Sequence, residues 1–415
     1  MLLIVSEQST PRLSYILHFI GEAWNMDVKL VQSAPIKSND VVIYYGPNEK
    51  NIAGVNIPCC KLLFENDIHP LKQEWNKENQ CLEHFCIDGK PDYFSAIFFH
   101  LSRYEEYLPT PLDSLGRFDY KCSVAYKNKA LNTPLVDVYL DKLLLQIQTV
   151  YPTFRIAKKK GTFTPTMDID VAFDYKGRSF PRTIGAYLKD LKSLELGNIW
   201  QRTITLLRLK PDPAFIFDKL KNQNILFFIH VGKYGKLDKS CGLKNPQFKS
   251  FLKSLSPKNI GLHPSFQSHL LSDEVALEKQ KLQELSEKNI SASRQHFIKM
   301  LLPESYELLS AIGITDDYSM GWPQIPGYRA ATVQNHNFYN LRTNEESTLR
   351  LHPFVWMDAH FLFNAHTDEE SIEKEFYFYR EQFVKYGGNF TPIFHNNHFK
   401  HQNFGAILYK LLASK

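Results

Sequence analysis

Short apolar runs alternate with amphipathic segments along most of this 415-residue chain. In its first part, two runs have the length and aliphatic content of buried strands: 2–5 and 41–45. Apolar residues recur at helical spacing in three further segments: 13–24, 94–107 and 136–150. The pattern predicts a small N-terminal α/β domain over residues 1–157.

The alternation continues from residue 163 to the C-terminal region. Strand-like runs lie at 163–171, 225–231, 260–263, 291–297, 316–319 and 390–395, and helix-like segments at 184–194, 213–221, 248–255, 274–288, 303–312 and 371–386. Apolar strands separated by helices are typical of a parallel sheet buried on both faces. About seven such units predict a distorted or incomplete (β/α) barrel over residues 162–415, with its site at the C-terminal strand ends.

A polar, glycine-bearing stretch, Lys158-Lys-Lys-Gly161, separates the two patterns. Stretches of this kind commonly join domains. We therefore expect a domain boundary there, with an N-terminal domain of unknown role before it.

Composition restricts the class of protein. Hydrophobic residues make up 43% and charged residues 22%, as in ordinary globular proteins. The net charge of +5 comes without a basic stripe interleaved with aromatics, so we expect no nucleic-acid partner. No run approaches the roughly 18–20 apolar residues of a membrane span, and the first run is too short for a signal peptide. These features predict a cytoplasmic protein.

The cysteines and one charged cluster have simple interpretations. The six cysteines form no CxxC pair and are expected to be reduced, mostly buried thiols: Cys59, Cys60, Cys81, Cys86, Cys122 and Cys241.

Charged and aromatic residues gather in Arg103-Tyr-Glu-Glu-Tyr107 and Gly116-Arg-Phe118. They could line an interface, but a solvated helix face with surface ion pairs is the simpler expectation.

Two carboxylates interrupt the apolar run at 163–171. Asp168 and Asp170 are two residues apart, so on a strand they point to the same face. They repel each other unless a proton or cation lies between them. Later strand-like segments end in His263, Arg294 and His395, which a barrel would bring to the same mouth. A bare Asp-x-Asp is equally common as a loop or capping pair.

These residues carry a resemblance to a known family. From residue 163 to about 399 the chain resembles the polysaccharide deacetylase (NodB homology) family, the fourth carbohydrate esterase family. Met167-Asp-Ile-Asp170 is similar to its first motif, and Ile393-Phe-His395 to its fifth. Arg294-Gln-His-Phe297 is similar to its third motif, with His296 in place of proline. In the second motif, the chain has His263 but carries Gln267 where the family has another histidine. The whole chain further resembles an uncharacterised bacterial branch with its own N-terminal domain.

The resemblance implies a metal-dependent hydrolase that removes N-acetyl groups from a saccharide. Asp168 would be the base that takes a proton from water, with Arg294 holding its carboxylate ionised. His395 would protonate the departing nitrogen. Asp170 and His263 would bind a divalent metal such as zinc, which lowers the pKa of water towards about 7.

A catalytic zinc normally takes about three protein ligands, and the resemblance supplies only Asp170 and His263. The sequence alone does not identify the third ligand. Gln267 is a poor substitute for imidazole. His296, which we include in the ligand set, and His269 could each complete the site, or the metal could be absent. Three aromatic residues could stack on a sugar, although core packing is an equal alternative: Tyr318, Tyr328 and Trp356.

Three functions are compatible with these residues. The first is a deacetylase acting on an amino-sugar-containing saccharide. The second is a hydrolase of another non-peptide C–N bond on the same barrel. The third is a glycan-binding or assembly protein without catalysis. The sequence names neither the saccharide nor the oligomeric state.

Overall fold

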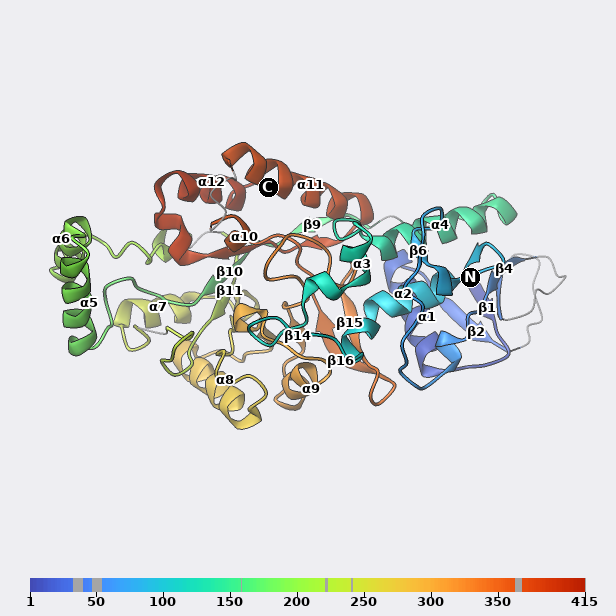
Figure 1. Ribbon diagram of the computed structural model, residues 1–415, viewed down its shortest axis with the longest axis horizontal. Coiled ribbons are helices and arrows are strands. Elements are labelled where there is room, and N and C mark those ends of the chain that lie inside the picture. The colour runs from blue at the N-terminus through green and yellow to red at the C-terminus, as the bar shows by residue number, and fades with distance from the viewer. Residues whose placement is uncertain are drawn as a thin grey trace.

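The protein is an elongated molecule with two main hydrophobic cores (Figure 1). The structure is a computed structural model. It describes residues 1–32, 40–46, 54–157, 159–220, 223–239, 242–362 and 368–414. Lys158, in the expected boundary, and Cys241 lie outside these ranges. No helix in these ranges is long and apolar enough to cross a membrane.

The N-terminal part contains a parallel four-stranded sheet in the order β2-β1-β3-β4. The strands are β1 (Leu2–Val5), β2 (Val28–Val31), β3 (Val41–Gly46) and β4 (Val55–Pro58). The main helices are α1 (Pro11–Trp24), α2 (Tyr93–Leu101) and α4 (Leu135–Val150). Thr10 caps α1 by accepting a hydrogen bond from the Leu13 N–H, and proline follows at the first helical position. The edge strands β2 and β4 escaped prediction because each is short and carries a polar residue.

The larger sheet has eight strands in the order β15-β16-β14-β13-β12-β11-β10-β18. The strands are β10 (Thr166–Ile169), β11 (Leu226–Ile229), β12 (Ile260–Leu262), β13 (Ala292–Ser293), β14 (Asp316–Asp317), β15 (His336–Asn340), β16 (Glu345–Leu351) and β18 (Ile393–His395). Neighbours are parallel except for the antiparallel pair β15–β16. No closed barrel is found in the described ranges. Residues 352–358 instead cross from β16 to β18, where Met357 bridges Ile393.

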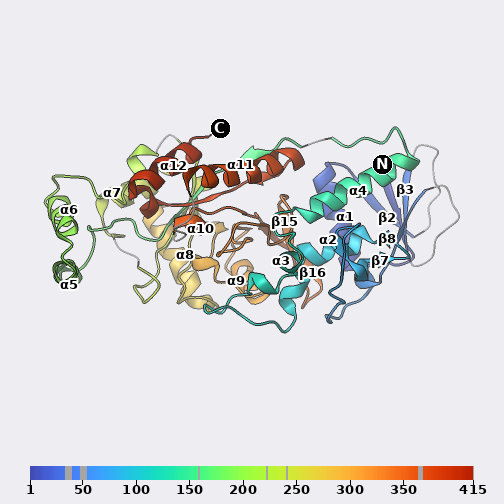
Figure 2. The ribbon, with the colours of Figure 1, turned by 45° about the horizontal axis from the view of Figure 1, so that its top comes forward.

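Helices flank this sheet on two sides, with α11 and α12 on one and α8 and α9 on the other (Figures 1 and 2). The helices of this part are α5 (Phe180–Lys192), α6 (Leu196–Leu206), α7 (Pro246–Ser254), α8 (Ser272–Ser286), α9 (Glu304–Ala311), α10 (Ala359–Leu362), α11 (Glu369–Tyr386) and α12 (Gln402–Leu412). The helix expected at 213–221 is wrong, since only a 3-10 turn at Phe217–Lys219 forms there. Asp212 explains this, because its carboxylate accepts hydrogen bonds from four backbone N–H groups and fixes a turn.

The N-terminal core includes side chains from the other end of the sequence. Ala331, Tyr339 and Leu341 belong to its hydrophobic cluster, and the Tyr15 hydroxyl donates to the Asn337 carbonyl at 2.8 Å. The hairpin β15–β16 therefore completes the core of residues 1–157. The boundary near Gly161 stays a prediction.

The cluster Arg103-Tyr-Glu-Glu-Tyr107 is buried, which corrects the expectation of a solvated helix face. The helix α2 ends at Leu101, and Arg103 adopts a left-handed φ of 54°. Glu106 then accepts hydrogen bonds from Arg103 Nε at 2.8 Å and from Arg329 Nη2 at 2.5 Å. Both guanidinium groups lie over the Trp322 ring. This ion-pair network joins the N-terminal part to the C-terminal part.

Glu106 is the centre of that network. Burial would raise its pKa, but Arg329 and Arg103 outweigh burial and lower the pKa to about 2, from an ordinary value of 4.5. A depressed folded-state pKa means that the carboxylate stabilises the fold above the ordinary value. That stabilisation is lost as the pH falls towards 2.

We expect Glu106→Gln to lower the free energy of unfolding at pH 7 by about 3–5 kcal/mol, because the buried Arg329 loses its paired carboxylate and Arg103 keeps only Glu105. Urea denaturation measures this change. Glu304→Gln is the matched control, since its pair with Arg342 is about half exposed on both sides, and its removal should cost less than about 1 kcal/mol. Equal losses in the two variants would contradict a stabilising buried network.

Candidate active site

The six predicted site residues lie together at the C-terminal ends of neighbouring parallel strands. Asp168 is on β10, in register with His395 on β18, and Asp170 follows β10 directly. His263 comes after β12, and Arg294 and His296 come after β13. Because parallel strands end at one edge of a sheet, residues far apart in sequence meet there.

Asp168 is fixed by a buried arginine. Arg294 Nη1 donates to Asp168 Oδ1 at 2.8 Å and to Thr166 Oγ1 at 2.7 Å, and Arg294 Nε donates to the Tyr318 carbonyl at 3.0 Å. The guanidinium is fully buried over the Phe228 ring. The other oxygen, Asp168 Oδ2, faces two imidazoles: His263 Nε2 at 3.9 Å and His395 Nε2 at 4.0 Å.

His395 is held by the buried carboxylate of Asp358. Its Nδ1 lies 2.6 Å from Asp358 Oδ1, and its backbone N–H donates to Asp358 Oδ2 at 2.7 Å. His398 Nδ1 lies 3.0 Å from the same Oδ2. Burial would lower the pKa of His395, but Asp358 outweighs it and the pKa rises to about 10. His395 is therefore a protonated imidazolium at neutral pH.

Asp170 faces two further histidines. Its Oδ1 lies 3.2 Å from His263 Nε2 and 3.6 Å from His296 Nε2, and this buried oxygen receives no hydrogen bond from the residues that the structure describes. Burial would raise the pKa of Asp170, but His296 and His263 hold it well below its usual range. One carboxylate oxygen and two imidazole nitrogens converge on a point, and these are donors that zinc prefers.

The far nitrogens of the two histidines have fixed partners. His263 Nδ1 lies 2.6 Å from the Arg294 carbonyl, which can only accept, so Nδ1 carries a proton and Nε2 is the nitrogen that faces Asp170. His296 Nδ1 lies 2.9 Å from Asp238 Oδ1. Metal-binding histidines characteristically give their other N–H to a carbonyl or carboxylate. The three residues therefore fit a divalent ion such as zinc.

Gln267 contacts the carboxylate of Asp238 and not the candidate metal ligands. Gln267 donates to Asp238 Oδ2 through both its backbone and its side chain at 3.1 Å. Burial would raise the pKa of Asp238, but hydrogen bonds from His296, Phe266 and Gln267 hold it below its usual range. Gln267 thus orients the carboxylate that orients His296. His230 also lies beside this carboxylate: its Nε2 is 3.9 Å from Asp238 Oδ1 and has no hydrogen-bond partner in the described part of the chain.

Several other candidates stay outside the cluster. His269 belongs to none of the metal-competent groups found among the described residues. Trp356 and Tyr328 are fully buried in the hydrophobic core, so the stacking interpretation is wrong for them. Tyr318 stacks on His352 with ring centroids 4.1 Å apart and supplies the carbonyl that Arg294 binds.

Sequence reasoning missed Asp238 and Asp358 as site residues. Asp358 ends the apolar run 351–358, so its position after a buried segment was an available signal. Asp238 lies in a loop outside any periodic segment, and no local pattern distinguishes it from a turn residue.

The N-terminal part reaches the segment that carries His296. Arg117 Nη1 donates to the Phe297 carbonyl at 2.5 Å, while Arg117 pairs with Asp113 at 2.7 Å. Lys299 Nζ donates back to the Gly116 carbonyl at 3.0 Å. Phe297 has a left-handed φ of 56°, so the N-terminal loop fixes an unusual backbone turn next to a site histidine.

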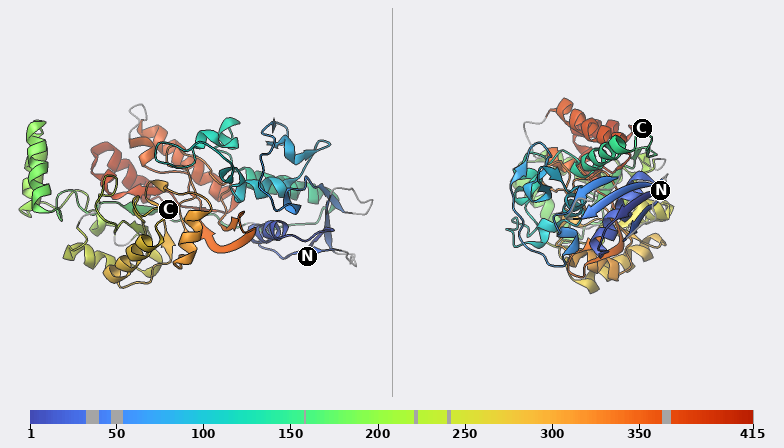
Figure 3. Two further views of the ribbon diagram at one scale, coloured as in Figure 1. Left: turned by 60° about the horizontal axis from the view of Figure 1, so that its bottom comes forward. Right: turned by 90° about the vertical axis from the view of Figure 1, so that its right-hand side faces the viewer.

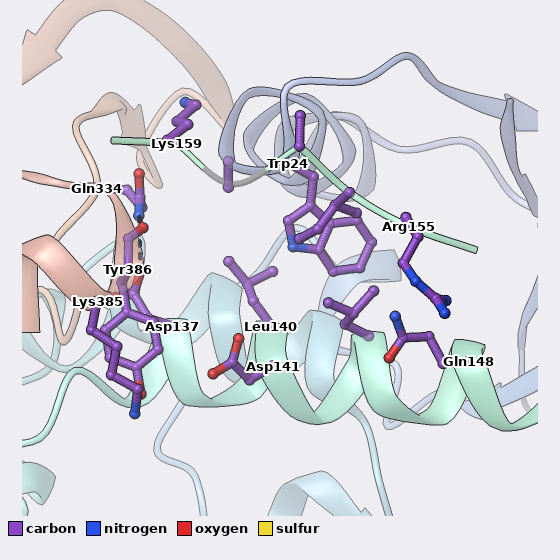
Figure 4. Close-up of a pocket in the computed structure, with 14 residues that line it drawn as sticks. Trp24, Asp137, Leu140, Asp141, Gln148, Arg155, Lys159, Gln334, Lys385 and Tyr386 are labelled. Atoms are coloured by element: carbon purple, nitrogen blue, oxygen red, sulfur yellow. Dashed lines mark hydrogen bonds between the residues drawn. The ribbon is translucent and has the colours of Figure 1, made fainter. Parts of the chain in front are cut away.

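A separate cavity of about 310 Å³ lies between α1, α4 and residues 334 and 385–386 (Figure 4). Trp24 and Leu140 form its apolar part. Asp137 lines it as well, and burial raises the pKa of this carboxyl to about 7. None of the six site residues lines this cavity.

Comparisons with known proteins identify only part of the chain. Residues 2–152 match a family model described as a family of unknown function (DUF7033). No curated protein matches the sequence. A crystal structure from Mycobacterium smegmatis, assigned as a polysaccharide deacetylase, is 15% identical with a TM-score of 0.37, covering 62% of this chain and 84% of its own. One from Bordetella bronchiseptica, assigned as a polysaccharide deacetylase of O-antigen biosynthesis, is 15% identical with a TM-score of 0.28, covering 58% and 74%.

We expect the purified protein to bind about one divalent ion per chain, and Asp170→Ala, His263→Ala and His296→Ala each to abolish that binding. Asp238→Asn should weaken it by about 10–100-fold, because His296 loses its orienting carboxylate. Elemental analysis and zinc titration calorimetry measure both effects without an activity assay.

His269→Ala is the matched control for these variants, because it removes a half-buried imidazole outside the cluster and should leave binding unchanged. A protein that takes up no ion when supplied with zinc would contradict the assignment of these ligands.

Proposed function

We propose that the protein is a metal-dependent hydrolase that removes N-acetyl groups from an amino-sugar-containing saccharide. The observation that carries the proposal is the position of Asp168. One of its oxygens is held by Arg294, and the other faces His395 and His263 beside Asp170. A base, a protonated acid and a candidate metal site therefore surround one point. The choice of an N-acetylated amino sugar rests on the motif resemblance.

Amide hydrolysis requires two proton transfers, which we assign to the side chains of Asp168 and His395. Asp168 Oδ2 takes a proton from the attacking water as the new bond to the acyl carbon forms, while Arg294 keeps Oδ1 occupied and the carboxylate oriented. His395 then gives its proton to the nitrogen as the C–N bond breaks, so that a free amine leaves. Asp170, His263 and His296 would hold a divalent ion, which would supply Lewis-acid polarisation of the acyl oxygen when bound.

His395 suits the acid role because of its partner. The Asp358 carboxylate stabilises the imidazolium before the reaction, and the contact at Nδ1 leaves Nε2 directed at Asp168. Asp358 thus positions His395 and sets its proton affinity. The same carboxylate also contacts His398, which adds a second positive partner when that imidazole is protonated.

We expect Asp168→Asn to reduce acetate release from N-acetylated oligosaccharides by about 10²–10⁴-fold, because asparagine keeps the shape but takes no proton. The bound metal should remain, since Asp168 is outside the ligand set. Asp316→Asn is the control: this aspartate also lies at a strand of the sheet but pairs with His352 at 2.7 Å. Near-full turnover of Asp168→Asn would contradict the proposed base.

We expect the reaction rate to fall at alkaline pH with a midpoint near the His395 pKa of about 10. The acid works only while protonated, so activity is present below that pKa and is lost as the pH rises through it. Asp358→Asn removes the carboxylate that raises the pKa, and the falling limb should then move towards or below the ordinary value of 6.5. The pH profile of kcat measures this shift.

Asp316→Asn is the control and should leave the alkaline limb of the kcat pH profile unchanged. An alkaline limb that does not move in Asp358→Asn would assign the acid to another group.

A further inference from the structure

The helices α5 and α6 form a hairpin at one end of the elongated molecule, apart from the bulk of the C-terminal part (Figure 3). The hairpin follows β10 directly, so it leaves the sheet at the edge where Asp168 and Asp170 lie. Near its base, the Arg182 guanidinium lies 3.8 Å from the Tyr234 ring centroid. Tyr234 belongs to the loop that also carries Asp238.

The hairpin has its polar side inside and its apolar side outside. Between the helices, Arg202 Nη2 donates to Asp190 Oδ2 at 2.5 Å, and the Tyr187 and Thr203 hydroxyls are 3.0 Å apart. The large apolar side chains face solvent at helical spacing: Phe180, Ile184, Leu188 and Leu191 on α5, and Leu196, Trp200 and Leu207 on or next to α6. A surface helix of a globular protein normally has the reverse arrangement.

These apolar residues are strongly exposed. Phe180 is 77% exposed, Trp200 67% and Leu188 62%. Contiguous exposed apolar surface of this kind marks an interaction site, because each such side chain is unfavourable in water. The described residues provide no other segment that covers it.

The hairpin is also strongly cationic. Residues 176–210 contain eight lysine or arginine side chains and two acidic ones. Their net charge of +6 exceeds the +5 of the entire protein. Amphipathic helices with exposed Trp, Phe and Leu and flanking Lys and Arg bind in the plane of anionic membrane surfaces.

We propose that the α5–α6 hairpin is a docking surface for an anionic phospholipid bilayer. The apolar stripes enter the headgroup boundary, and Lys189, Lys192, Arg208 and Lys210 contact lipid phosphates. A second copy of the chain fits this face less well, because two hairpins of charge +6 would repel each other. The inference rests on the hairpin alone and not on the proposed deacetylase activity.

Co-sedimentation of the full-length protein with vesicles tests the proposal. We expect binding to vesicles that contain phosphatidylglycerol, and little binding to pure phosphatidylcholine or at high salt. Lys189→Gln and Lys192→Gln should each weaken binding by about fivefold. Trp200 is by far the most exposed of the five tryptophans, so its fluorescence should shift to the blue on binding, and Trp200→Phe should lose the shift but still bind.

Matched variants distinguish vesicle binding by the hairpin from nonspecific binding through any exposed apolar side chain. Leu188→Asp with Trp200→Asp should abolish vesicle binding and leave thermal unfolding unchanged, since both positions are exposed. Leu145→Asp is the control, because Leu145 on α4 is 67% exposed, as Trp200 is, and its loss should have no effect on binding.

Three results would overturn the proposal. The first is an absence of vesicle binding at low salt, and the second is binding that survives the paired aspartate substitutions. The third is a concentration-dependent dimer, seen by sedimentation equilibrium, that the same substitutions dissociate. That dimer would assign the face to a second copy of the chain.

Discussion

The contact between Arg294 and Asp168 is the constraint on which the site depends. A guanidinium with no exposed surface needs charge and hydrogen-bond partners, because its desolvation is costly. Asp168 and Thr166 on β10, and the Tyr318 carbonyl directly after β14, supply them. These contacts link β10 to the segments that follow β13 and β14. Asp168 consequently presents Oδ2 to His263 and His395. Asp170 follows two residues later, directly after β10.

The sequence differs from the motifs it resembles at Gln267 and at His296, and the structure connects these two positions. His296 lies near Asp170 and His263. Gln267 and Asp238 then form the support for His296. Such support fixes which nitrogen an imidazole presents.

The sequence predicted those features that repeat or that follow buried strands. The apolar runs at 225–231, 260–263 and 390–395 became strands of one parallel sheet, and the polar residues after them met. The sequence did not predict the β15–β16 hairpin, whose pairing depends on distant contacts, or the helix α6, whose apolar face is exposed. It also suggested a solvated surface for Arg103–Tyr107, because composition does not tell whether opposite charges are buried together.

The loop at 113–118 has a consequence for how such a protein can change over evolutionary time. Its contacts to Phe297 and Lys299, and the completion of the N-terminal core by Tyr339 and Leu341, tie residues 2–152 to the other part. A recombination event that replaced either part alone would break a core and loosen the turn beside His296. The two parts are therefore expected to be inherited as a unit, with compensating substitutions appearing across their shared boundary.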